Sequence, residues 1–170
     1  MSQASVLIAT THDLPRRAGE MRPWKRVVPA PDDLGIAMIG VPEGSPVELD
    51  LRLESVVEGI WVSGTATVRV AGQCVRCLTE LDEQRCFSIG ELYHYPGKEA
   101  EEDALFVTGE QIDLDPALRD AVVLELPFSP LCRTDCRGLC PQCGTDLNAD
   151  PDHAHDVPAD PRWAALRAFH

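Results

Sequence analysis

The sequence of 170 residues is long enough for one domain with appended segments, and division into two full domains would leave both of them small. Its hydrophobic content of 44% is ordinary for a globular protein, but aromatic residues make up only 5%, so aliphatic side chains must fill the core. The 15 basic and 28 acidic residues give a net charge of −13, which opposes broad binding to nucleic-acid backbones and favours basic partners such as ribosomal proteins.

The N-terminal region is predicted to contain a short strand and then a basic arm. Residues 4–9 suit a strand, and no basic segment precedes them as in a signal peptide, so we expect a cytoplasmic protein. No run in the chain approaches the roughly 18 uncharged apolar residues that a membrane span needs, so we expect no membrane association. The arm, at about residues 10–31, is interrupted by four prolines.

The charge of this arm differs in sign from that of the rest of the chain. Residues 1–30 hold five basic and two acidic residues, a net of +3, whereas the remaining residues carry −16. We favour an arm that packs along the edge of the domain. The alternative is contact with RNA or a partner through the basic and aromatic side chains of the arm, namely Arg16, Arg17, Arg22, Trp24, Lys25 and Arg26.

An antiparallel sheet is the strongest prediction for the middle of the chain. Apolar and polar residues alternate over 47–54 and again over 60–70, on either side of a turn at Glu58-Gly59. A weaker strand pattern follows at 85–93, where Cys86 is expected to be a small buried residue. Each strand would have one buried and one solvated face.

One helix is predicted to cover this sheet. After an acidic loop at 96–109, Asp113 or Asp115 can cap a helix that has Pro116 in its first turn and ends before Pro127. The fold class is therefore α+β, with a β-rich core over residues 1–130, a cysteine-rich zinc-binding segment over 131–148, and an acidic linker with a short terminal helix over 149–170. The apolar stripe of the main helix consists of Leu114, Leu118, Ala121, Val122 and Leu124.

The seven cysteines indicate a metal site, because cytosolic thiols are kept reduced. Cys132, Cys136, Cys140 and Cys143 fall within twelve residues at the spacing with which zinc is bound, and CPQCG resembles a zinc knuckle. Cys74 and Cys77 form a further pair between two predicted strands. Three alternatives stay open: a local site made by the four tail cysteines, a composite site that joins Cys74 and Cys77 to one tail pair, or no metal.

Other readings of these cysteines are less favoured. The spacing also suits an iron–sulfur cluster, and Cys74-x2-Cys77 resembles a thiol–disulfide motif without the helix start that would activate its first thiol. His153 and His155 are expected to be solvated in the acidic linker. No phosphate loop, nucleophile elbow or paired carboxylates are present, and a zinc with four thiolates is structural, so we expect neither an enzyme nor a small-molecule substrate.

Four stretches together resemble the YceD family, in particular its actinobacterial type. They are GQCVRCL at 72–78, EQIDLDPALRDAVVLELPFSPLC at 110–132, DCRGLCPQCGTDLN at 135–148 and DPRWAALRAF at 160–169. The resemblance covers about residue 49 to the C-terminus and extends more weakly into DLPRRAGEMR. Some relatives keep the first cysteine pair while their tail cysteines are partly replaced or absent, which favours a role for Cys74 and Cys77.

The resemblance implies a non-catalytic ribosome-biogenesis factor. The family is implicated in keeping large-subunit (23S) ribosomal RNA at normal levels, and its gene commonly lies beside that of a small zinc-bearing ribosomal protein. The expected partner is a large-subunit protein or an assembly intermediate, with structural Zn²⁺ as the cofactor. The alternatives are direct RNA binding or processing through the basic arm, and a cysteine-based redox or iron–sulfur sensor.

Overall fold

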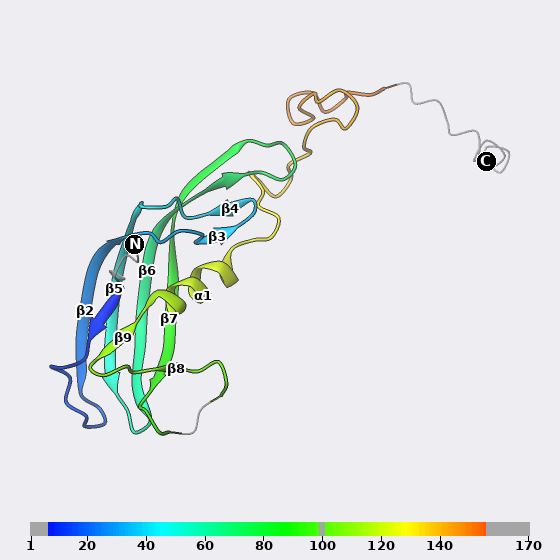
Figure 1. Cartoon of the computed structure of the whole chain (residues 1–170). Helices are drawn as coiled ribbons and strands as arrows, with labels where there is room; N and C mark the ends of the chain where they lie inside the picture. Colours follow the sequence, from blue (N-terminus) through cyan, green and yellow to red (C-terminus); the bar gives the residue numbers. More distant parts are fainter. Residues whose placement is uncertain (1–6, 99–100, 156–170) are drawn as a thin grey trace.

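The fold is built on a long antiparallel sheet, seen in a computed structural model that describes residues 7–98 and 101–155 (Figure 1). Four strands form a meander in the order β2 (Met21–Pro29), β5 (Pro46–Ser55), β6 (Gly59–Gln73) and β7 (Glu80–His94). A two-residue hairpin of β3 (Gly35–Ile36) and β4 (Ile39–Gly40) extends the sheet beside β6, and β8 (Leu105–Phe106) pairs in parallel with β7.

β6 is the central strand and determines where the cysteines lie. It pairs with β7 along its full length, from Gly59 opposite His94 to Gln73 opposite Glu80. On its other side it pairs first with β5 and then, farther along, with β4 at Ala71 and Gly72. The β6–β7 hairpin therefore extends beyond β5, and its closing loop holds Cys74 and Cys77.

The predicted alternation is present in both long strands. In β5 the residues Val47, Leu49, Leu51 and Leu53 are at most 3% exposed, and all but Leu51, which faces Gly64, lie opposite buried residues of β6. Gly64 breaks the row of inward side chains, because a Cβ there would lie 2.2 Å from the carbonyl oxygen of Asp50. The sheet thus has one apolar face, as the period of two requires.

α1 (Asp115–Glu125) lies across this apolar face (Figure 1). Its buried residues are Ala117, Leu118 and Val122. Leu124 is 80% exposed, so the prediction that it belongs to the buried stripe of the helix is wrong. The helix starts at Asp115 with Leu114 as the N-cap residue, and the Asp113 carboxylate accepts a hydrogen bond from the Asp115 N–H at 3.0 Å. A separate two-stranded sheet is formed by β1 (Ile8–Thr10) and β9 (Gln111–Asp113), and the helix follows β9 in the chain.

Cys86 departs from its expected burial, and the basic arm contains a strand of the main sheet. This strand, β2, pairs with β5 over nine residues, so this part of the arm is an edge strand. Cys86 is exposed, since its neighbour Phe87 points into the core and adjacent residues of a strand face opposite sides. The predicted terminal helix at 160–169 lies outside the described residues.

Candidate metal centre

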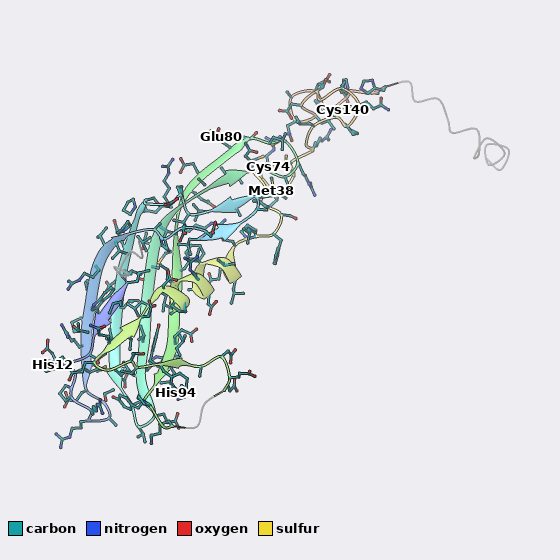
Figure 2. The ribbon with its side chains drawn as sticks, viewed as in Figure 1. His12, Met38, Cys74, Glu80, His94 and Cys140 are labelled. Carbon is teal, nitrogen blue, oxygen red and sulfur yellow. The ribbon has the colours of Figure 1, made fainter. Side chains whose placement is uncertain are left out.

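The loop between β6 and β7 is a tight turn that presents two cysteines. The N–H of Cys74 donates to the carbonyl of Thr79 at 2.9 Å, and the N–H of Leu78 donates to the carbonyl of Cys74 at 2.9 Å. Leu78 adopts a φ of 59°, which is uncommon for a residue with a side chain. The turn closes the tip of the hairpin, and Figure 2 shows Cys74 toward the end of the molecule opposite His12 and His94.

The chain that follows α1 returns to this loop and adds a second cysteine pair. The Pro130 carbonyl accepts a hydrogen bond from the Val75 N–H at 2.9 Å, which fixes the start of the cysteine-rich segment against the hairpin tip. The Arg76 guanidinium donates to the carbonyl of Cys136 at 2.8 Å. Cys132 and Cys136 are thereby held beside Cys74 and Cys77, although they follow them in the sequence by more than fifty residues.

The four sulfur atoms lie within 4.8 Å of one another and form a compact cluster. The Sγ atoms of Cys74 and Cys136 are 3.8 Å apart, and those of Cys77 and Cys132 are 3.5 Å apart. Four Zn–S bonds of about 2.3 Å in a tetrahedron give edges of about 3.8 Å. The separations therefore fit four thiolates around a single ion, whereas a disulfide would need about 2 Å.

Hydrogen bonds to these sulfurs favour thiolates. Burial raises the pKa of Cys74, but the N–H groups of Cys77, Cys132 and Arg76 outweigh this effect and lower it to about 6. The pKa of Cys77 is lowered, chiefly by the Thr79 hydroxyl group. The pKa of Cys132 is raised, chiefly because its thiol shares a hydrogen bond with Cys77.

Thiolates are the form that binds metal, so a bound dication favours loss of the thiol protons of the cluster.

The other two tail cysteines belong to a second cluster. Cys140 and Cys143 lie with His153 and His155, and the four ligand atoms are again within 4.8 Å of one another. The local alternative, in which Cys132, Cys136, Cys140 and Cys143 share one ion, is not the arrangement that the structure forms. Cys132 and Cys136 are held at the hairpin tip by the contacts of Pro130 and Arg76, and the second tail pair lies with the histidines.

The sequence reasoning missed the two histidines, which were expected to be solvated in the linker. The only signal in the sequence was that a His-x-His pair follows the CPQC pair, at a spacing shorter than that of the usual Cys-Cys-His-His zinc patterns. The pattern was outweighed by the acidic, proline-containing composition of residues 149–159, which is typical of a linker.

The two clusters are connected by Asn148. Its side-chain amide donates to the Sγ of Cys136 at 3.6 Å and to the Asp146 carboxylate at 2.7 Å. Its carbonyl oxygen accepts a hydrogen bond from the Arg137 N–H at 2.8 Å. A residue of the second cluster's loop thus supports a ligand of the first.

Two of the five basic residues of the arm form ion pairs within the domain. Lys25 forms an ion pair with Asp50 at 2.7 Å, and Arg22 approaches Asp13 at 3.4 Å. The aromatic member of the arm, Trp24, is 6% exposed, so its ring lies in the core and not on a surface for base stacking. The Arg16 guanidinium lies over the ring of Tyr95, and that of Arg26 lies over the ring of Trp24. Arg17 is exposed.

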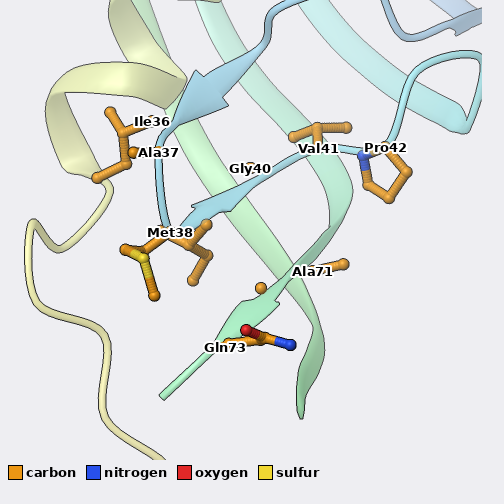
Figure 3. A pocket seen from close by; sticks show the side chains of 10 residues that line it. Ile36, Ala37, Met38, Gly40, Val41, Pro42, Ala71 and Gln73 are labelled. Atoms are coloured by element: carbon orange, nitrogen blue, oxygen red, sulfur yellow. The ribbon is translucent and has the colours of Figure 1, made fainter. Parts of the chain in front are cut away.

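A groove of about 410 Å³ lies beside the β3–β4 hairpin (Figure 3). Its lining is apolar or backbone, apart from the amide of Gln73. It contains no acid, base or nucleophile that could take part in a reaction. No helix in the described part of the chain has the length and apolarity required to cross a bilayer.

Comparisons with known proteins identify relatives of this chain. Residues 62–170 match the model of a family described as large ribosomal RNA subunit accumulation protein YceD. An uncharacterized protein of Mycobacterium tuberculosis is 43% identical over 96% of this chain and 81% of its own length. An uncharacterized protein of Bacillus subtilis is 26% identical over 72% of the chain and 73% of its own length.

A plant relative carries a functional name. The large ribosomal RNA subunit accumulation protein YCED homolog 1 of Arabidopsis thaliana, which is chloroplastic, is 25% identical over 63% of this chain and 43% of its own length. No solved structure matches the chain.

Proposed function

This chain belongs to the YceD family, and from this premise we propose that it is a non-catalytic ribosome-biogenesis factor that supports the accumulation or processing of large-subunit ribosomal RNA. The family is named for large ribosomal RNA subunit accumulation and has no known catalytic activity. In this proposal the chain binds a basic large-subunit protein or an assembly intermediate in the cytoplasm.

The convergence of Cys74, Cys77, Cys132 and Cys136 is the observation that carries the proposal. With all four positions of a tetrahedron taken by thiolates, a zinc ion there has no open position for water or substrate and acts as a structural staple. It would join the cysteine-rich segment to the β6–β7 hairpin. The separations of 3.5 and 3.8 Å support a single ion, because an iron–sulfur cluster would hold the thiolates farther apart.

Charge supports a basic partner. Four thiolates around a dication leave a net negative charge, which adds to the −13 of the chain. A negative potential of this kind accelerates the encounter with a positively charged protein and makes the association sensitive to salt.

Direct RNA binding through the arm has weaker support. Lys25 and Arg22 already face carboxylates, and the Trp24 ring is buried. The exposed basic groups that remain are few compared with the acidic surface of the body.

The test combines affinity purification with complementation. We expect the tagged, zinc-loaded chain to recover large-subunit proteins from a lysate of the encoding organism at low salt, with less recovered at high salt. A strain without the gene should have a reduced ratio of 23S to 16S ribosomal RNA, which the wild-type chain restores.

Matched variants link this function to the metal centre and separate it from the arm. Cys77→Ser with Cys132→Ser should fail in both assays, while Cys86→Ser, an exposed cysteine outside both clusters, should behave as wild type. Arg16→Ala with Arg17→Ala should leave recovery unchanged, and its loss would favour the RNA-contact alternative. Recovery of no large-subunit component at low salt would refute the proposal.

A further inference from the structure

The loop containing Cys140 and Cys143 repeats the backbone geometry of the loop containing Cys74 and Cys77. The N–H of Cys140 donates to the carbonyl of Thr145 at 2.8 Å, and the N–H of Gly144 donates to the carbonyl of Cys140 at 2.8 Å. These are the same two bonds, at the same sequence offsets, that close the first loop. Gly144 has a φ of 77°, in the left-handed region that Leu78 occupies in the other loop.

The side chains around the second cysteine of each loop also correspond. A threonine hydroxyl lies 3.1 Å from the Sγ of Cys143, and its counterpart Thr79 lies 3.2 Å from the Sγ of Cys77. Two stretches far apart in the sequence thus form the same sulfur-presenting turn, and each turn faces a second pair of ligand side chains.

His153 and His155 are the second pair at the tail loop. The Sγ of Cys143 lies 3.1 Å from the Nε2 of His153 and 3.2 Å from that of His155, and the two Nε2 atoms are 2.9 Å apart. Zinc bonds of about 2.0 to 2.3 Å in a tetrahedron give edges of about 3.3 to 3.6 Å for these atoms. The ligand atoms would therefore move apart by only a few tenths of an ångström to accept the ion.

The orientation of the rings supports metal binding over a simple thiol–imidazole hydrogen bond. The two imidazoles are nearly perpendicular, at 85°, and both direct Nε2 to the sulfur. The other nitrogen of His153, Nδ1, faces the Asp150 carboxylate at 3.7 Å, a distance longer than a hydrogen bond. A hydrogen bond needs two groups, whereas here four ligand atoms converge.

The segment that carries these ligands is compact but has neither a helix nor a strand of its own. The Leu147 N–H donates to the carbonyl of Gly138 at 3.0 Å, and Leu139 forms an isolated bridge with Asp146. So short a loop buries little apolar surface, and loops of this size ordinarily depend on a metal or disulfide for stability.

We propose that Cys140, Cys143, His153 and His155 bind a second structural zinc ion, separate from the four-cysteine centre, and that the chain therefore binds two zinc ions. This site goes beyond the proposed function, and it does not depend on any ribosomal partner. Its two thiolates balance the charge of the dication, so the two centres differ in net charge as well as in ligands. The second zinc would fix residues 138–155 as a rigid extension of the hairpin tip.

The test is the zinc content of the purified, reduced full-length chain after gel filtration with a weak chelator. We expect two zinc ions per chain in the wild type and one in His153→Ala with His155→Ala. His12→Ala, a histidine at the opposite end of the molecule, and Cys86→Ser should keep two. Circular dichroism should show an intact sheet in each variant, because the sheet does not include residues 138–155.

Cobalt substitution assigns the ions to their sites. The paired histidine variant should keep the intense thiolate-to-cobalt absorption of a four-cysteine centre, and Cys77→Ser with Cys132→Ser should keep the weaker absorption of a centre with two thiolates. One zinc ion per wild-type chain, or two in the paired histidine variant, would overturn the proposal. Neither result would bear on ribosomal RNA accumulation, which is measured separately.

Discussion

The Asn148→Ala substitution should weaken zinc binding at the four-cysteine centre, although Asn148 is not a ligand. It removes the N–H donor to the Cys136 sulfur at 3.6 Å and the acceptor that holds the Arg137 N–H at 2.8 Å. A hydrogen bond to a charged group contributes about 1.5 to 3 kcal/mol. Loss of such outer partners typically lowers metal affinity by about 10- to 100-fold, which corresponds to about 1.4 to 2.8 kcal/mol.

Two further variants separate the contributions. Asn148→Asp keeps the acceptor for Arg137 but replaces the donor with a negative charge beside thiolates, so we expect an affinity as low as that of the alanine variant or lower. Gln142→Ala changes an exposed amide in the neighbouring knuckle and should have no effect on this centre. Affinity is measured by competition with a chromophoric chelator, with the cobalt absorption of the four-cysteine centre as the readout. A change of less than about threefold in Asn148→Ala would refute the reasoning, since the loss of a hydrogen-bond donor to a ligating sulfur should lower the affinity by about tenfold or more.

Two predictions concern the fold that supports the site. Leu118→Ala removes a fully buried side chain between α1 and the sheet and should lower the free energy of unfolding in urea by about 3 to 5 kcal/mol, whereas Leu124→Ala, at an exposed position, should change it by less than about 0.5 kcal/mol. Tyr93→Phe removes a hydrogen bond to the Asp113 carbonyl and should cost about 1 kcal/mol at neutral pH. Burial raises the pKa of Tyr93, so its contribution is present below about pH 10 and is lost as the pH rises further. The stability difference between wild type and Tyr93→Phe, measured in zinc-loaded protein, should therefore shrink at alkaline pH; a constant difference would contradict this.

The sheet could be predicted from the sequence because its signal is local. Val47, Leu49, Leu51 and Leu53 alternate with charged residues, and a strand with this pattern can bury only one face. The same rule would have placed Cys86 correctly, because Phe87 beside it is the inward residue. The error came from treating cysteine as a buried residue type without applying the strand period.

The helix could also be predicted from the sequence, but its buried stripe is narrower than the predicted one. Leu118 and Val122 are buried as expected. Leu124 is exposed because α1 contacts the sheet along one side only and Leu124 lies on the other side, close to the end of the helix. How far a helix is covered depends on what packs beside it, which the helical period alone does not specify.

Each cysteine pair with metal-binding spacing could be predicted from the sequence alone. A pair separated by two residues needs only a local turn to direct both sulfurs to one side. Which pairs meet was decided by the tertiary structure. The long β6–β7 hairpin carries Cys74 and Cys77 past the edge of β5, and α1 crosses the sheet so that the chain returns to that tip with Cys132 and Cys136. Cys140 and Cys143 lie instead with His153 and His155, which follow them in the chain. A tetrahedral ion requires four ligands from separate directions, and only the path of the whole chain brings them together.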